Sequence, residues 1–252
     1  MSLKNLKKKK YHRKSTMDLS GLKRVVNPAL KKRNDETFSV LVDNINRNTR
    51  SGHLSLESVE LYREDYLIFN DISFQIKSGD HLVIRGQNGS GKTSLIRTIC
   101  GLTQPDKGKV LWNEVSIDRS LHNYYEQIAY LGHKNGLIPE LTLDENLDYG
   151  IGQIDKDRQD QVINGFRLGD LRDSLIQNLS NGESRKTALS RVVSSKNPLW
   201  VLDEPYANLD SDSISYLNNC IGDHIKTGGI VITSTNRDDS IATKTTELLL
   251  GS

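Results

Sequence analysis

A glycine-rich segment followed by a lysine and two hydroxyls holds the residues best suited to chemistry. Residues 86–94 read Gly-Gln-Asn-Gly-Ser-Gly-Lys-Thr-Ser. Glycine loses more backbone freedom on folding than any other residue, so three glycines in one short loop indicate a backbone shape that side chains would block. Such a loop, leading into a helix, points its N–H groups at an anion. Lys92 adds a positive charge, and Thr93 offers a hydroxyl to Mg²⁺.

The residues on either side predict the strand and the helix that such a loop requires. Residues 81–86, HLVIRG, are a short apolar strand running into the loop, and residues 93–102, TSLIRTICGL, space their apolar residues at helical intervals, with Gly101 as a C-cap. G-x-x-x-x-G-K-[ST] between a strand and a helix is the phosphate-binding loop (P-loop) of nucleotide-binding proteins. The predicted nucleotide-binding residues are Gly86, Asn88, Gly89, Ser90, Gly91, Lys92, Thr93 and Ser94.

A second apolar run supplies the acids that a P-loop needs. Residues 198–205 read PLWVLDEP, typical of a buried parallel strand that carries two acids at its carboxyl end. Ligands bind at this end of open α/β sheets. We predict that Asp203 and Thr93 hold Mg²⁺ and that Glu204 orients or deprotonates an attacking water.

A third segment, LSNGE at 179–183, predicts another anion site. Ser180 is a good helix N-cap, and Ser-x-Gly at the start of a helix, here Ser180 and Gly182, presents free N–H groups. One nucleotide cannot use two distant sites in one chain. We therefore expect a head-to-tail dimer, in which each copy's LSNGE segment closes over the partner's nucleotide.

The order of these motifs, with ANLD at 207–210, resembles the ATP-binding cassette (ABC) ATPases over roughly residues 54–250. The resemblance implies an α/β fold of the P-loop NTPase class, with an antiparallel β edge and a helical subdomain. It also implies ATP and Mg²⁺ as cofactors, a paired cassette, and separate transmembrane subunits. The family's signature usually ends in Gly-Gly-Gln, so Asn181 and Glu183 are departures.

Several longer phrases resemble one subgroup, the ATP-binding subunits of haem exporters in cytochrome c maturation. They are KVLWNEVSI, IAYLGHKNGLIPELTLDENL, LWVLDEPYANLD and GGIVITSTN. The subgroup places Tyr-x-Gly-His where most cassettes have a glutamine near Mg²⁺ and water, which assigns that role to His133. The resemblance implies haem-handling proteins as partners. The alternative for His133 is a surface histidine without a catalytic role.

Two further positions depart from the ABC pattern. Most cassettes have a histidine that contacts the γ-phosphate after the strand following the catalytic one, and Asn236 stands there. Asparagine can donate a hydrogen bond to phosphate but carries no charge, so slower hydrolysis is expected. An aromatic residue usually stacks on adenine before the ISF strand. Tyr62 and Arg63 are both candidates for that contact.

Charge divides the chain in two. Residues 1–53 carry 14 Lys and Arg against 4 Asp and Glu, a net of +10, whereas the remainder carries a net of −8. This extension is too polar to fold alone. Three interpretations stay open: a solvated tail, a mitochondrial targeting segment, or a segment that binds an anionic surface. Aromatic residues suited to base stacking are not interleaved in it, so we predict no nucleic-acid partner.

We expect the folded domain to span 54–252. Residues 54–118 predict an antiparallel edge and the P-loop unit, residues from about 119 to 185 a helical subdomain, and residues 186–250 parallel strands alternating with helices. Apolar runs in the sequence are shorter than a membrane helix needs, and two cysteines are too few for a disulfide framework.

Three functional hypotheses follow. The first is an ATPase subunit of a membrane exporter, acting at the matrix face of the mitochondrial inner membrane or, alternatively, at the cytoplasmic face of a bacterial inner membrane. The second is a low-turnover cassette retained as a structural subunit of a large mitochondrial membrane assembly. The third is a soluble cassette acting on ribosomes or DNA, disfavoured because such proteins usually hold two cassettes or a coiled-coil insertion.

Overall fold

A computed structural model describes residues 52–149, 155–236 and 245–251. The chain divides into two units, Met1–Asn44 and Ile45–Ser252, and every described residue belongs to the second. The basic extension predicted over 1–53 therefore lies outside the described residues, apart from its last two. The domain boundary at residue 54 stays a prediction.

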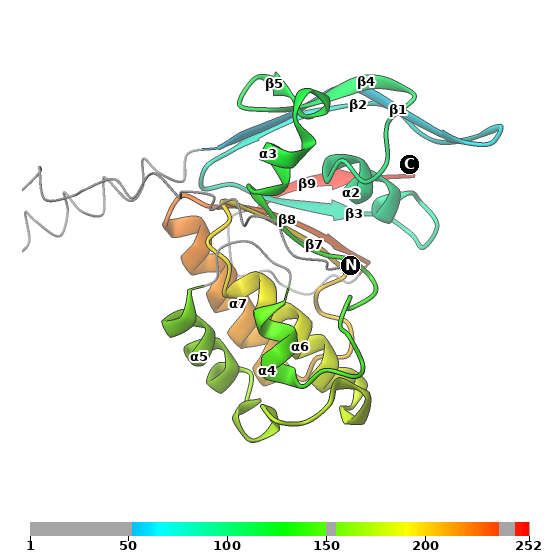
Figure 1. Cartoon of the computed structure of the whole chain (residues 1–252). Coiled ribbons are helices and arrows are strands. Elements are labelled where there is room, and N and C mark those ends of the chain that lie inside the picture. Colours follow the sequence, from blue (N-terminus) through cyan, green and yellow to red (C-terminus); the bar gives the residue numbers. More distant parts are fainter. Residues whose placement is uncertain (1–51, 150–154, 237–244, 252) are drawn as a thin grey trace, which may run out of the picture. The chain divides into compact units, whose positions relative to one another are not determined.

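A five-stranded parallel sheet forms the centre of the described part (Figure 1). Its strands in spatial order are β6 (Ile128–Leu131), β7 (Leu199–Asp203), β8 (Ile230–Thr235), β3 (His81–Arg85) and β9 (Thr246–Leu249). Every residue of β7 and β8 is buried, as the apolar runs at these positions predict for strands covered on both faces.

A second sheet is antiparallel and covers one face of the first (Figure 1). Its strands in spatial order are β2 (Tyr66–Lys77), β1 (His53–Arg63), β4 (Lys107–Trp112) and β5 (Val115–Ser116). Helix α2 (Lys92–Ile99) lies between the two sheets. A 3₁₀ turn (Ile117–Arg119) and α3 (Leu121–Tyr125) follow β5 along the chain. Gly101 follows α2 at φ +69°, the left-handed conformation expected after a helix end.

The remaining helices lie on the opposite face of the parallel sheet (Figure 1). They are α4 (Leu143–Asp148), α5 (Lys156–Gly165), α6 (Asn181–Val193) and α7 (Ser211–Lys226), with 3₁₀ turns at Gly169–Leu171 and Ile176–Asn178. Strand β6 interrupts the segment that the sequence predicts to be mostly helical, about 119–185, because its buried residues pair with β7. The helical part therefore begins only at α4.

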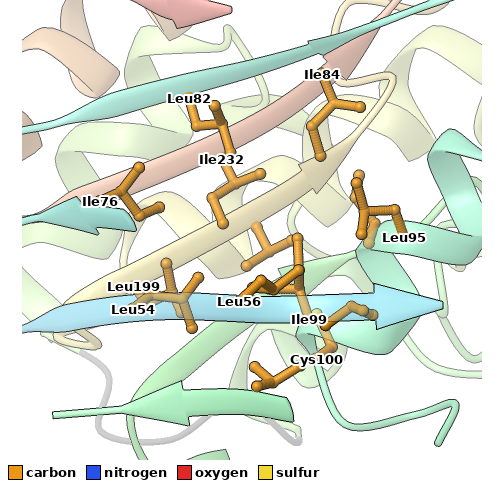
Figure 2. Packing of buried hydrophobic residues seen from close by; sticks show 14 of the residues in the cluster. Leu54, Leu56, Ile76, Leu82, Ile84, Leu95, Ile99, Cys100, Leu199 and Ile232 are labelled. Atoms are coloured by element: carbon orange, nitrogen blue, oxygen red, sulfur yellow. The ribbon is translucent and has the colours of Figure 1, made fainter. Parts of the chain in front are cut away.

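Strand alternation assigns neighbouring residues to two separate cores. Leu199 and Val201 face the antiparallel sheet and α2, whereas Trp200 and Leu202 face α4 to α7. Figure 2 shows the first core, where side chains of β1, β2, β3 and β8 surround Leu95 and Ile99 of α2. The P-loop helix is thus packed from both sides, which fixes where its N-terminus points. Among the described residues, no helix is long and apolar enough to cross a membrane.

Candidate functional site

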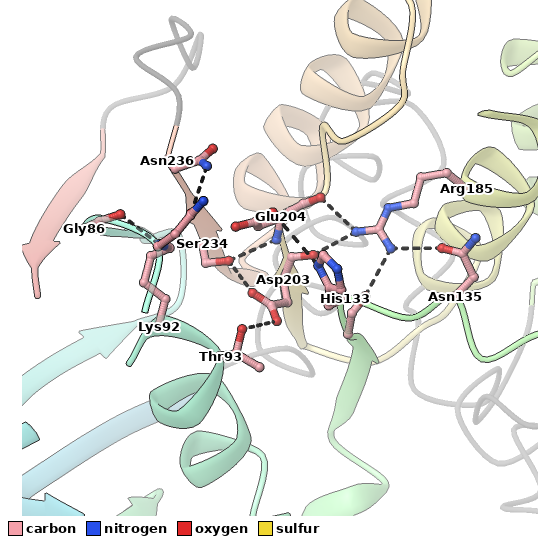
Figure 3. A network of polar contacts seen from close by, with 12 residues as sticks. Gly86, Lys92, Thr93, His133, Asn135, Arg185, Asp203, Glu204, Ser234 and Asn236 are labelled. Carbon is pink, nitrogen blue, oxygen red and sulfur yellow. Dashed lines mark hydrogen bonds and ion pairs between the residues drawn. The ribbon is translucent and has the colours of Figure 1, made fainter. Parts of the chain in front are cut away.

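The carboxyl ends of four parallel strands bring the predicted chemical residues together. Asp203 at the end of β7 pairs with Ser234 on β8, and Arg85 at the end of β3 pairs with Thr235. Leu131 ends β6 beside Leu202, so the loop with His133 begins at the same edge. Segments far apart in sequence therefore meet as Figure 3 shows.

The P-loop has the backbone shape that its glycines predict. Gly86, Gly89 and Gly91 all have positive φ, and a Cβ on Gly86 would lie 2.6 Å from the carbonyl oxygen of Leu250. Around Gly89 nothing described lies within 4 Å of the place of a Cβ, so the loop is open there. Directly after the loop come the first N–H groups of α2, which have no hydrogen-bond partner within the helix. This donor set fits a phosphate chain.

Lys92 begins α2 and lies almost wholly buried, 6% exposed. Its ammonium donates to the carbonyl oxygens of Gly86 at 2.7 Å and Gln87 at 3.0 Å (Figure 3). Carbonyl oxygens of the loop itself thus hold the ammonium of Lys92. A phosphate oxygen is a stronger acceptor than these carbonyls, so the ammonium is placed to exchange partners when an anion binds.

Asp203 lies at the centre of a short chain of hydroxyls. Its carboxylate accepts from the hydroxyl of Thr93 at 2.8 Å and from the hydroxyl of Ser234 at 2.5 Å, and the residue is 1% exposed. A carboxylate beside a hydroxyl is an oxygen donor set that fits Mg²⁺, which usually takes one or two protein oxygens together with phosphate and water. Among the described residues, no group of three His, Cys, Asp or Glu side chains forms a metal cluster.

Glu204 has an unusual backbone conformation. Its φ is +48°, a left-handed conformation that a residue with a side chain adopts at a cost of about 1–3 kcal/mol. Its N–H donates to the hydroxyl of Ser234 at 2.9 Å. The result is a partly exposed carboxylate at the strand end, with one oxygen 4.0 Å from Nδ1 of His133 (Figure 3).

The sequence analysis missed three residues of this network: Arg185, Ser234 and Asn135. Arg185 donates to the backbone of Asp203 and to Asn135. A signal for it exists, since Arg185, Ala188, Leu189 and Val192 follow the i, i+3, i+4, i+7 spacing of a buried helix face. A charged residue on such a stripe needs buried partners.

Asn236 follows β8 directly and reaches the P-loop. Its side-chain N–H donates to the side-chain oxygen of Asn88 at 3.2 Å (Figure 3). This contact places the uncharged Asn236 beside the loop predicted to bind phosphates, where the ABC pattern has histidine.

The LSNGE segment begins α6 as predicted, with Ser180 as the N-cap. The hydroxyl of Ser180 accepts from the N–H of Glu183, and the carboxylate of Glu183 accepts from the N–H of Ser180 at 2.8 Å. These bonds hold the pKa of Glu183 below its ordinary value. A Cβ on Gly182 would lie 3.0 Å from the carbonyl oxygen of Asn208, so the segment lies against the ANLD loop.

The two candidates for adenine stacking lie at the end of β1. Tyr62 is 41% exposed and its N–H donates to Asp106 at 2.6 Å, whereas Arg63 pairs with Tyr66 across the hairpin. The choice between the two stays a prediction.

A cavity of about 520 Å³ lies beside the network. Thr93, His133, Arg97 and Tyr130 line it, together with Arg191 of α6. Burial raises the pKa of the Tyr130 phenol to about 12, with the nearby Cys100 and Asp203 adding to the effect. The phenol therefore stays neutral at the rim of the site.

The fold and the site together define a P-loop protein built to bind a nucleoside triphosphate. The family model described as ABC transporter matches residues 69–207, more than half of the chain. The cytochrome c biogenesis ATP-binding export protein CcmA of Histophilus somni is 37% identical over 194 residues, covering 75% of this chain and 89% of that protein. The CcmA protein of Colwellia psychrerythraea is 34% identical over 187 residues, covering 73% and 85%.

Solved structures agree in fold. The ATP-binding subunit of an ABC transporter superposes with a TM-score of 0.66 at 25% identity, covering 73% of this chain and 79% of that chain. A dimeric cassette in a post-hydrolysis state with ADP and phosphate superposes with a TM-score of 0.70 at 21% identity, covering 78% and 94%.

The chain belongs to the ABC transporter family and is an ATP-binding subunit that hydrolyses ATP. The predicted fold class, family and enzymatic activity are thereby confirmed. Cassettes of this family dimerise and pair with transmembrane subunits.

Proposed function

We propose that this chain binds ATP between its P-loop and the LSNGE segment of a second cassette, and that the ATP-bound pair drives a membrane exporter. The observation that carries the proposal is the chain of contacts from Thr93 through Asp203 and Ser234 to Glu204, at the sheet edge where the P-loop begins. These contacts support the proposal because they hold the hydroxyl of Thr93 on the carboxylate of Asp203 and connect Asp203 to the turn with Glu204.

The roles divide by chemistry. Gly86, Asn88, Gly89, Ser90, Gly91 and Ser94 shape the loop around the phosphates, and Lys92 moves from the loop carbonyls to the β/γ-phosphates. Thr93 and Asp203 would hold Mg²⁺. When bound, Mg²⁺ neutralises charge that develops on the phosphate oxygens.

Glu204 is the proposed base. Its carboxylate accepts a proton from the water that attacks the γ-phosphorus, while the bond from that phosphorus to the β,γ-bridging oxygen breaks and ADP leaves. The ring of His133, 4.0 Å from the carboxylate, orients the water. Asn236, held against the P-loop by Asn88, donates a hydrogen bond to the γ-phosphate. Tyr62 or Arg63 stacks on adenine.

The second cassette completes the site. Ser180 and Gly182 of the paired cassette present the N-terminus of their helix to the γ-phosphate. ATP binding clamps the two together, and hydrolysis releases them. The partner is a second copy of this chain or a related cassette.

The transported cargo is proposed from the relatives. Three CcmA proteins, cytochrome c biogenesis ATP-binding export proteins, are 34–37% identical to this chain over about three quarters of its length. On that likeness, we assign this chain to the haem exporter of cytochrome c maturation, with haem-handling proteins as partners. The basic extension over 1–53 supports attachment at the matrix face of the mitochondrial inner membrane; the alternative is the cytoplasmic face of a bacterial inner membrane.

A second candidate is a low-turnover cassette retained as a structural subunit of a large mitochondrial membrane assembly. Asn236 motivates it, since an amide cannot supply the positive charge of a histidine at the γ-phosphate. Asn236→His would raise the hydrolysis rate several-fold if that missing charge limits turnover. An unchanged rate would remove the motive for this candidate.

Two experiments test the proposal. Isolation of the chain from native membranes in mild detergent, followed by identification of what accompanies it, tests the assembly. A polytopic membrane protein with haem-handling partners supports the exporter, and fixed stoichiometry in a large assembly supports the structural subunit. Glu204→Gln tests the chemistry: hydrolysis should stop while an ATP-bound dimer accumulates. A Glu204→Gln rate equal to the wild-type rate would refute the role of Glu204.

A further inference from the structure

One buried guanidinium joins three segments of the site. Arg185 lies in the second turn of α6 and is 3% exposed. Its Nη2 donates to the carbonyl oxygens of Asp203 at 2.7 Å and Glu204 at 2.8 Å. Its Nη1 donates to the carbonyl oxygen of Gly132 and to the side-chain oxygen of Asn135, both at 3.0 Å (Figure 3). The two Nη groups act as the arms of a fork: Nη2 contacts the turn after β7, and Nη1 contacts the loop after β6.

The acceptors are unusual for a buried cation. Buried charges normally pair with a carboxylate, yet the hydrogen bonds of Arg185 go to three backbone carbonyls and one amide. Burial lowers the pKa of Arg185, and the charges of Asp203 and Glu204 partly oppose this shift. Because a carbonyl direction is fixed by its peptide plane, the three bonds to carbonyl oxygens restrain the course of the chain, and the fourth holds the side chain of Asn135.

The backbone segments that Arg185 contacts carry the side chains of Glu204 and His133. Glu204, at φ +48°, is held on its N–H side by Ser234 and on its carbonyl side by Arg185. A strained backbone persists only where its surroundings over-determine it. His133 follows Gly132, whose carbonyl accepts from the other arm. One guanidinium therefore contacts the backbone of Glu204 and the backbone of the residue that precedes His133.

We propose that Arg185 is a positioning residue for ATP hydrolysis, which holds the Glu204 turn and the His133 loop in register with the helix that begins at Ser180. The inference rests on the proposed role of Glu204 as the base. Arg185 acts only through the backbone and Asn135 and touches no reacting atom. Since Ser180 and Arg185 share one rigid helix, a shift of α6 when its N-terminus meets the partner's ATP moves both arms of the fork together.

The chain offers a matched control on the same helix. Arg191 also donates through both Nη groups to backbone carbonyls, those of Gly136 and Tyr149. Burial lowers the pKa of Arg191 as well. Gly136 lies on the same loop as His133, but neither acceptor lies on the turn after β7, so Arg191→Lys loosens that loop without touching the backbone of Glu204.

The test compares the full-length wild-type chain with Arg185→Lys and Arg191→Lys, measuring kcat, KM and ATP binding. Lysine keeps the charge but has one nitrogen, which cannot span both segments. We expect Arg185→Lys to lower kcat at least about tenfold with KM and ATP affinity changed less than about threefold. Arg191→Lys, which releases Gly136 of the His133 loop but nothing on the turn after β7, should lower kcat by no more than about threefold. An equal fall in kcat for both variants, or an unchanged kcat for Arg185→Lys, overturns the inference.

A double variant separates positioning from general damage. Glu204→Asp leaves a slow, measurable rate, and adding Arg185→Lys to it should slow hydrolysis by less than about threefold if Arg185 acts through Glu204. A full additional tenfold loss overturns the inference. An unchanged rate in Glu204→Asp and Glu204→Gln would refute the proposed base itself, a separate failure. If Arg185→Lys does not fold, Asn135→Ala releases one arm and should lower kcat several-fold at unchanged ATP affinity; an unchanged kcat overturns the inference.

Discussion

Removal of one hydroxyl, in Ser234→Ala, should disturb both stability and hydrolysis. This fully buried hydroxyl donates to the carboxylate of Asp203 at 2.5 Å and accepts the N–H of Glu204 at 2.9 Å. Alanine fits the space but leaves a buried carboxylate with one donor fewer and a strained residue with its N–H released. Both losses fall on the turn that carries the proposed base.

The magnitude follows from the two bonds. A hydrogen bond to a charged group contributes about 1.5–3 kcal/mol, and a released N–H in a partly buried place costs about 1 kcal/mol. Together they predict a loss of about 3 kcal/mol in the free energy of unfolding. For a domain of roughly 200 residues, about 2–4 °C of Tm per kcal/mol gives a fall of about 6–12 °C.

Urea unfolding of wild type and Ser234→Ala measures the loss, provided that the m value is unchanged. Ser190→Ala is the matched control, since Ser190 is equally buried but its hydroxyl donates to the carbonyl of Lys186 within α6. The control should change the unfolding free energy by less than about 1 kcal/mol, because alanine favours helix. A Ser234→Ala loss no larger than that of the control would refute the view that this hydroxyl holds the turn.

Two further predictions concern titration and charge. Burial lowers the pKa of His81 to about 4. Below about pH 6.5 the unfolded chain therefore binds a proton at His81 that the folded chain does not bind. The stability contributed by neutral His81 is fully present above pH 6.5 and is lost as the pH falls toward 4. Between pH 6.5 and pH 4, the free energy of unfolding of His81→Gln should fall by up to about 3 kcal/mol less than that of the wild type. Equal falls for the two proteins would contradict this prediction. Glu183→Gln keeps the capping box but removes a carboxylate from the proposed γ-phosphate site. Dimerisation should therefore occur at a lower ATP concentration, and sedimentation of proteins that also carry Glu204→Gln measures that concentration. Glu145→Gln changes the equivalent capping box of α4 and should leave the required ATP concentration unchanged.

The sequence predicts the parts of the site that are contiguous. Residues 86–94 contain both the glycines that shape the P-loop and the lysine that it holds, and their backbone conformation is local. Asp203 is predictable because an apolar strand that ends in an acid occurs in the same chain as a P-loop, which needs an acid to hold its metal. The fold class follows from such strands alternating with helices and from the antiparallel pattern of residues 53–77.

The remainder of the site depends on long-range register. Ser234 meets Asp203 only because β7 and β8 pair in parallel with that alignment, and a shift of one residue would turn its hydroxyl to the other core. Arg185 finds its acceptors on two different strands' loops, which no local pattern encodes. The left-handed conformation of Glu204 likewise follows from those two partners and not from its own residue type.

The position of Arg185 on α6 has a consequence for the paired cassette. In the proposed head-to-tail dimer, Ser180 of the first copy would contact ATP on the P-loop of the second copy, while Arg185 of the first copy donates to the backbone of the first copy's Glu204. Each α6 thus connects one ATP to the base that acts on the other. Mixed dimers with a single Ser180→Arg copy should therefore lose hydrolysis at both sites, measured as single turnover of ATP by purified heterodimers. Retention of half the wild-type activity would mean that the two sites work independently and that α6 serves only to close over the partner's nucleotide.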